Sequence, residues 1–118
     1  MDIHYATRDE LLCLARDALR IAGRGTPPGR SVEDLGRMVG LLTETLDALD
    51  GALEEVARLT SQECGSGRVV AVDGMFAGDT DAAADATVLW IRRGRKTLHQ
   101  ARPAVVNAHI AAGGLAQS

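Results

Sequence analysis

Aromatic residues and cysteines are scarce in this 118-residue chain. It contains one Phe, one Tyr and one Trp, so its hydrophobic core must be built mainly from Leu, Val and Ala. Such side chains suit close-packed helices better than a sheet sandwich. The two cysteines, Cys13 and Cys64, are too few and too unpatterned for a disulfide framework or a zinc site.

Long apolar runs are also missing. The first ten residues, MDIHYATRDE, lack the basic segment and apolar stretch of a signal peptide. No run approaches the roughly 18 apolar residues of a membrane-spanning helix. We therefore expect a cytoplasmic protein without a membrane partner. Because domains typically run to about 100–150 residues, the length predicts a single domain over residues 1–118.

The residues that most often carry chemistry form no recognisable site. No acid lies between residues 86 and 118, so His99 and His109 have no neighbouring carboxylate in sequence. The Glu-x-x-His spacing of a metal-binding bundle is absent, and no histidine lies near Cys13 to act as its base. The glycines at 65–68 lack the spacing and lysine of a phosphate-binding loop. We expect no catalytic residues, metal or cofactor, and hence no enzyme.

A heptad seam is the strongest positive signal. Apolar residues recur every three or four positions between residues 31 and 60, at Leu35, Val39, Leu42, Leu46, Leu49, Leu53, Val56 and Leu59. This pattern is typical of a long amphipathic helix that buries one face against other helices. Ser31 is a suitable N-cap, and the helix is predicted to run to about residue 62. Gly36, Gly40 and Gly51 lie off the seam. They indicate either local flexibility of the helix or a close approach by a neighbouring partner.

A shorter helix is predicted over residues 7–22. Thr7 and Glu10 have the spacing of a capping box. Apolar residues fill about half of the helix circumference, which is typical of a helix that packs into the groove between two others. Residues 26–29, Thr-Pro-Pro-Gly, form a stiff connector to the next helix.

A third helix is predicted over residues 80–112, with Asp79 or Thr80 at its start. Pro103 should kink this helix or begin a new one. The small residues Gly94, Ala101 and Ala108 should let it approach its neighbour closely. Trp90 is expected to be a core or interface anchor. Before this helix, residues 64–79 are expected to form a Gly-rich connector whose valines and Phe76 tuck against the bundle.

Together these elements predict an all-α fold. We expect a three-helix antiparallel bundle with helices at about 7–22, 31–62 and 80–112, in which the last two form a long hairpin and the first lies in its groove. Met38 and Leu41 extend the apolar surface beyond a narrow seam. Self-association into a four-helix or larger bundle is therefore predicted.

Charge is distributed unevenly along the chain. Residues 1–66 hold twelve acids and seven bases, whereas residues 86–118 hold five bases and no acid. The candidate basic contact face on the third helix comprises Arg92, Arg95, Lys96, His99 and Arg102. The candidate acidic interaction face on the long helix comprises Asp47, Asp50 and Glu54. The basic face is expected to be either a solvated helix face or a contact surface for the acidic face of another helix, and the complementarity of the two faces also suggests a route to self-assembly.

The sequence favours a small non-enzymatic adaptor or regulatory subunit that binds protein and forms a homo-oligomer. The alternative is an accessory nucleic-acid-binding protein that uses the basic face of the third helix. The net charge of −3 disfavours the alternative, since a phosphate-binding protein is usually basic. In addition, no aromatic residue is interleaved for base stacking, and no helix-turn-helix signature precedes the basic face.

Overall fold

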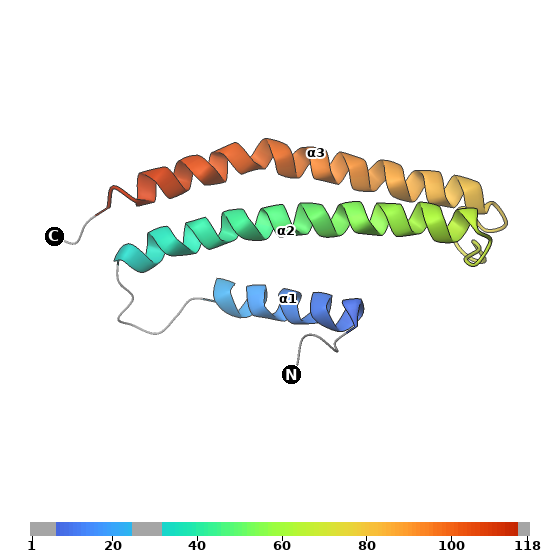
Figure 1. The fold of residues 1–118 in the computed structure, drawn as a ribbon, viewed down its shortest axis with the longest axis horizontal. Coiled ribbons are helices and arrows are strands. Elements are labelled where there is room, and N and C mark those ends of the chain that lie inside the picture. Colours follow the sequence, from blue (N-terminus) through green and yellow to red (C-terminus); the bar gives the residue numbers. More distant parts are fainter. Residues whose placement is uncertain (1–6, 25–31, 116–118) are drawn as a thin grey trace. The chain divides into compact units, whose positions relative to one another are not determined.

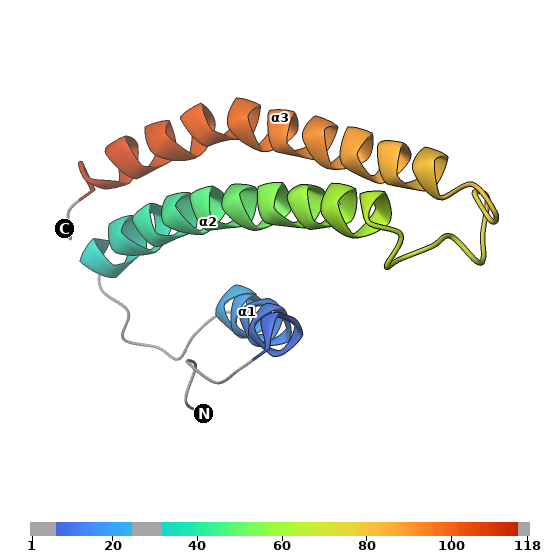
Figure 2. The ribbon, with the colours of Figure 1, turned by 45° about the vertical axis from the view of Figure 1, so that its right-hand side comes forward.

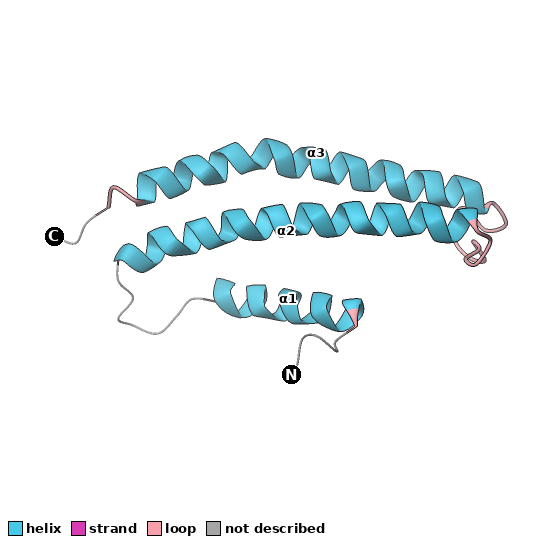
Figure 3. Cartoon of the chain, in the orientation of Figure 1, coloured by secondary structure: helices cyan, strands magenta, loops and turns pink. Residues whose placement is uncertain are grey.

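The computed structural model describes residues 7–24 and 32–115. These residues form three α-helices: α1 (Arg8–Gly23), α2 (Val32–Gly65) and α3 (Thr80–Ala112) (Figure 1). Within the described ranges there is no strand, and Figure 3 shows helix and loop alone. The predicted all-α class is confirmed, and each predicted helix boundary lies within three residues of the observed one.

The chain divides into two compact units, Met1–Ser31 and Val32–Ser118. The first contains α1 and the second contains α2 and α3. The single domain and the packing of helix 7–22 into the hairpin groove therefore stay predictions. The predicted cap at Ser31 and the connector at 26–29 lie outside the described residues.

The predicted N-cap begins α1. The Thr7 hydroxyl oxygen accepts a hydrogen bond from the Glu10 amide at 3.1 Å and donates one to the Glu10 carboxylate, also at 3.1 Å. In the usual capping box the carboxylate instead accepts from the backbone amide of the N-cap residue. The helix is amphipathic, and within its own unit its leucines and Ile21 are exposed.

A left-handed glycine ends α2. Gly67 has a φ of 78°, which favours glycine because it has no Cβ. Its amide donates to the Cys64 carbonyl at 3.2 Å, and the Val69 amide donates to the Glu63 carbonyl at 3.3 Å. Two carbonyls that the helix end would otherwise leave free are thereby satisfied.

Backbone hydrogen bonds close the connector between α2 and α3 on itself. The Gly78 amide donates to the Ala71 carbonyl at 2.9 Å, and the Ala71 amide donates to the Thr80 hydroxyl at 3.0 Å. Gly74 and Gly78 both have positive φ, which allows the tight turns. The connector is therefore an ordered loop.

The side chains of this connector do not tuck against the hairpin as predicted. Val72 is 81% exposed and Met75 is 92% exposed, and Val70 and Phe76 are also exposed. Ala71 is the half-buried residue of this segment. Its amide donates to the Thr80 hydroxyl, and its carbonyl accepts from the Gly78 amide. Val69, Val70 and Ala71 line a hollow with Thr60 and Cys64 of α2 and Ala83, Ala84 and Thr87 of α3, so the connector contacts the hairpin at its edge without burying its valines.

Asp79 is the N-cap of α3, and it is one of the two residues predicted to start this helix. Its carboxylate accepts a hydrogen bond from the Ala82 amide at 3.1 Å. The helix continues through Pro103, so the expectation of a new helix at that residue is wrong. Pro103 lacks the amide that would bond to the carbonyl of His99. Figures 1 and 2 show α3 gently bowed, with its convex side away from α2.

The helices α2 and α3 form an antiparallel hairpin (Figure 2). The direction follows from the contacts, since Asp50 bonds to Arg95 while the earlier Gly36 bonds to the later His109. The residues of α2 nearest α3 are half-buried, and no hydrophobic side chain among the described residues is fully buried.

The heptad seam is divided between two environments. Its residues Val39, Leu46, Leu53 and Leu59 are half-buried, and the first three lie within 60° of helix rotation of Asp50, which contacts α3. The alternate positions are exposed by 42% to 47% and comprise Leu35, Leu42, Leu49 and Val56. We call these four residues the apolar stripe. The hairpin buries only one half of the seam that the sequence predicts to be buried.

Candidate interaction surfaces

A bidentate ion pair joins the middle of α2 to the middle of α3. Arg95 donates from Nε to Asp50 Oδ1 at 2.8 Å and from its terminal nitrogen to Asp50 Oδ2 at 3.3 Å. The same terminal nitrogen lies 3.3 Å from Glu54 Oε2. The side chains of Arg95 and Asp50 are 24% and 21% exposed, so this pair is the least solvated of the ion pairs between the two helices. A planar guanidinium that meets a carboxylate in this way fixes the register of the hairpin.

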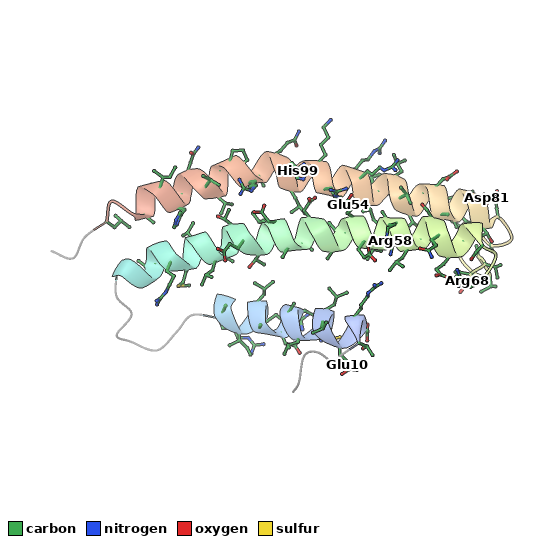
Figure 4. The ribbon with its side chains drawn as sticks, viewed as in Figure 1. Glu10, Glu54, Arg58, Arg68, Asp81 and His99 are labelled. Atoms are coloured by element: carbon green, nitrogen blue, oxygen red, sulfur yellow. The ribbon has the colours of Figure 1, made fainter. Side chains whose placement is uncertain are left out.

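Two further contacts extend this cluster. His99 Nε2 lies 3.1 Å from Asp50 Oδ1, and Arg102 donates to the two oxygens of Asp47 at 2.7 and 3.1 Å. Figure 4 places His99 on α3 beside the stretch of α2 that carries Glu54. We call this cluster the ion-pair flank; its members are Asp47, Asp50, Glu54, Arg95, His99 and Arg102.

The contacts of the ion-pair flank lower the pKa of two of its carboxylates. Hydrogen bonds from Arg95 and His99 hold the pKa of Asp50 at about 2, below its ordinary value of 3.8. The hydrogen bond from Arg102 likewise lowers the pKa of Asp47. Each pKa is lowered because the hydrogen bonds, above all those from the guanidinium groups of Arg95 and Arg102, favour the ionised carboxylate.

The two charged faces predicted from sequence therefore meet within one chain. Of the five candidate basic residues, Arg95, His99 and Arg102 contact the three candidate acidic residues. The other two, Arg92 and Lys96, are exposed and make no ion pair with any residue that the structure describes. The basic face of α3 thus contacts the acidic face of another helix, as one of its predicted roles, and it does so within one copy and not between copies.

An aromatic and basic patch lies on the outer face of α3. The Arg93 guanidinium lies 4.8 Å from the centroid of the Trp90 ring, in a cation–π contact. Trp90 is 64% exposed, so it is not a core residue. Arg93 was absent from the predicted site, although its spacing of three residues from Trp90 is the signal that pairs side chains on a helix. We call the following residues the outer patch: Leu89, Trp90, Arg92, Arg93 and Lys96.

Glycines of α2 make room for a histidine of α3. His109 Nδ1 lies 2.9 Å from the carbonyl oxygen of Gly36, and a Cβ added at Gly40 would lie 2.9 Å from His109 Cε1. Gly40 therefore permits close approach by α3. At Gly51 an added Cβ would meet nothing within 4 Å, so that glycine has no packing reason.

The predicted close approach through Gly94, Ala101 and Ala108 is wrong. All three are exposed, and a Cβ added at Gly94 would meet nothing within 4 Å. The helix instead faces α2 with the neighbouring positions Arg95 and Leu98, because the bidentate pair at Arg95 sets its rotation.

The apolar stripe and the ion-pair flank lie on different faces of α2. Leu49 precedes Asp50 by 100° of helix rotation, and Gly94 precedes Arg95 by the same angle. The face of α2 that carries the stripe is therefore turned by about 100° from the face that pairs with Arg95. The hairpin thus has a charged side at the ion-pair flank and an apolar side at the stripe.

No grouping of three or more His, Cys, Asp or Glu side chains in the described residues is arranged to hold a metal ion. None of the described helices has the length and apolar character needed to cross a bilayer. The chain matches no protein family, and neither a characterised protein nor a solved structure is similar enough to be matched to it.

Proposed function

We propose that this protein is a small, non-enzymatic helical interaction subunit that self-associates through the apolar stripe of α2. The observation that supports the proposal most is the exposure of four heptad-spaced apolar residues, at 42% to 47% each. Burial of apolar side chains is the main source of stability for a helix in a protein. An exposed stripe of this regularity favours a helical partner.

The geometry of the heptad explains why one neighbour is insufficient. In a two-helix coiled coil, both apolar positions of each heptad face the same partner. Here α3 covers the set at Val39, Leu46 and Leu53, while the set that includes Leu42 and Leu49 is open. An apolar face this wide is typical of a helix that has neighbours on two sides.

A second copy of the chain can cover the exposed apolar stripe. The stripe repeats every seven residues, so the same surface on another copy presents matching knobs and holes about a two-fold axis. It extends from Leu35 to Val56, about 32 Å at 1.5 Å per residue. By the same measure the 16 residues of α1 span about 24 Å. A second α2 matches the full length of the stripe.

The nucleic-acid alternative has less support. Three of its five candidate contacts lie in ion pairs with Asp47, Asp50 and Glu54. A phosphate backbone that used these cations would have to displace three carboxylates and would be repelled by them.

The mass of the protein in solution tests the proposal. Light scattering at micromolar concentration should give twice the 12.4 kDa chain mass. The double variant Leu42→Asp/Leu49→Asp should be a monomer, because two charges in an apolar interface are strongly unfavourable. Val72→Asp/Met75→Asp is the matched control: it adds the same two charges at exposed apolar residues of the connector, and its mass should equal that of the wild type.

Two results would overturn this proposal. One is a wild-type monomer at these concentrations, which would leave α1 of the same chain as the occupant of the stripe. The other is a double variant that keeps the dimer mass while circular dichroism shows it to be folded.

A further inference from the structure

We propose that the outer patch of α3 is a second docking surface, which binds an acidic amphipathic segment of another protein. This inference is additional to self-association, because the patch lies on a face of α3 turned away from α2, whereas the apolar stripe belongs to α2. It uses Arg92 and Lys96, the two predicted contact residues that the ion-pair flank leaves without an ion pair.

The patch combines apolar area with three cations, of which Arg93 is held by Trp90. Trp90 is 64% exposed and Leu89 is 46% exposed, so both offer apolar surface to a partner. The Arg93 guanidinium lies 4.8 Å from the Trp90 ring centroid, which limits the freedom of both side chains before any partner arrives. Trp and Arg are the residues most enriched where binding energy concentrates at protein interfaces.

A hollow adjoins the patch and offers an anchor point. It has a volume of about 440 Å³ and is lined by Ser61 of α2 and by Asp85, Val88, Leu89 and Arg92 of α3. Leu89 and Val88 supply apolar walls, while Arg92 contributes a positive charge and Asp85 a negative one. An apolar side chain of the partner can enter this hollow while a neighbouring carboxylate meets Arg92.

Charge complementarity selects an acidic partner. Arg92, Arg93 and Lys96 lie within two helical turns, and the sequence has no acid after Asp85. Arg92 and Lys96 have no carboxylate within ion-pair distance in the described residues. Asp or Glu side chains on a partner would supply the missing negative charge and would speed its association.

The same features favour a protein over a nucleic acid. From Leu89 to Lys96 the patch extends only about 10 Å along the helix. The neighbouring cations of α3, Arg95 and Arg102, are already in ion pairs with Asp50 and Asp47 of α2. A phosphate backbone following α3 would therefore meet the negative ion-pair flank after a few contacts. A short acidic segment with apolar side chains uses the whole patch.

Trp90 is the only tryptophan of the chain, so a change in its fluorescence at constant oligomer mass reports on this surface. The probe is a 16-residue amphipathic peptide without Trp, with Asp and Glu on one face and Leu and Phe on the other. Added to the full chain, it should shift Trp90 emission to shorter wavelength, because the ring leaves water on binding. In the variant Arg92→Glu/Lys96→Glu its affinity should fall by about tenfold or more.

Matched controls separate the contributions. Arg58→Glu/Arg68→Glu makes the same change in net charge at cations of α2 and the connector, and it should bind the peptide as the wild type does. A peptide with Lys in place of each acid should not shift the emission. The dimer mass should be unchanged in Arg92→Glu/Lys96→Glu, so failure of this surface is distinguishable from failure of the apolar stripe.

Three outcomes would overturn the inference. The acidic peptide could leave the emission unchanged at millimolar concentration, or the Lys peptide could bind as tightly, which would indicate apolar contact without charge selection. The third is binding of an oligothymidylate with loss in Arg92→Glu/Lys96→Glu and no binding of the peptide, which would assign the patch to nucleic acid.

Discussion

Along one side of the α2/α3 hairpin the acidic residues of α2 are matched by cations of α3, whereas along the other side the heptad leucines are exposed. The charged side joins two helices of one copy. Its bidentate pair between Asp50 and Arg95 forms only in one register and one rotation of α3. The apolar side has no such partner and, on the proposal above, joins two copies.

The difference shows that register and driving force come from different residues. Solvent-exposed ion pairs contribute little stability, so the ion-pair flank chiefly fixes the geometry. The free energy that holds helices together comes mostly from apolar burial. Half of that apolar surface is still open in the hairpin, which is why a second copy has a thermodynamic reason to bind.

The largest effect is expected inside the hairpin, at the covered half of the seam. Leu53→Asp places a charge between α2 and α3, and it should lower the free energy of unfolding by about 3 kcal/mol or more. Leu41→Asp, at an exposed position off both faces, should cost much less. Urea unfolding followed by circular dichroism measures both. Equal losses in the two variants would mean that α3 does not cover Leu53.

A smaller effect is expected where α3 approaches the glycines of α2. Gly51→Ala should raise the unfolding free energy by about 1 kcal/mol, because alanine is the better helix former and the added Cβ meets nothing. Gly40→Ala should gain less or lose stability, because its Cβ would lie 2.9 Å from His109 and displace that ring from Gly36. The difference between the two urea midpoints is the measurement. If both alanines stabilise equally, the close contact with His109 is absent.

The smallest effect concerns the acid dependence of the ion-pair flank. Because the folded pKa of Asp50 is about 2 and its ordinary value is 3.8, folding favours the ionised form. The stability from this group is present in full above its ordinary pKa and is lost as the pH falls from 3.8 towards 2. Asp50→Asn should reduce stability at neutral pH and flatten this acid-induced loss.

Urea midpoints measured at a series of pH values test this expectation. Glu44→Gln is the control, since Glu44 lies on the same helix outside the ion-pair flank. An Asp50→Asn variant with the same acid dependence as the wild type would show that the pair with Arg95 does not persist in solution.

The helices were predictable because their signals are local. The capping residues Thr7 and Asp79 and the heptad spacing from Leu35 onward depend on neighbours within a few positions. The rotation of α3 follows its apolar pattern only in part, since Ile91, Leu98 and Val105 are half-buried whereas Trp90, Gly94 and Ala101 are exposed. The choice is made by Asp50 and Arg95, which are 45 residues apart in the chain.

The residues of the candidate charged faces were predicted from the sequence, but the way they contact one another was not. The acidic and basic residues were identified, but charge alone does not reveal whether opposite faces meet within one copy or between two. The contact of His109 with Gly36 and Gly40 depends on the antiparallel register of the two helices. The spacing of residues along the sequence does not reveal that register. The contact of Arg93 with Trp90 was accessible from the i,i+3 spacing and was overlooked.

The central claim is that the apolar side joins copies and the charged side joins helices within a copy. Sedimentation equilibrium on three chains tests it most directly: the wild type, Leu42→Asp/Leu49→Asp and Asp47→Asn/Asp50→Asn. We predict a dimer, a folded monomer and a dimer of reduced stability, respectively. A monomeric Asp47→Asn/Asp50→Asn variant beside a dimeric Leu42→Asp/Leu49→Asp variant would contradict this account, because the charged side would then hold the copies together.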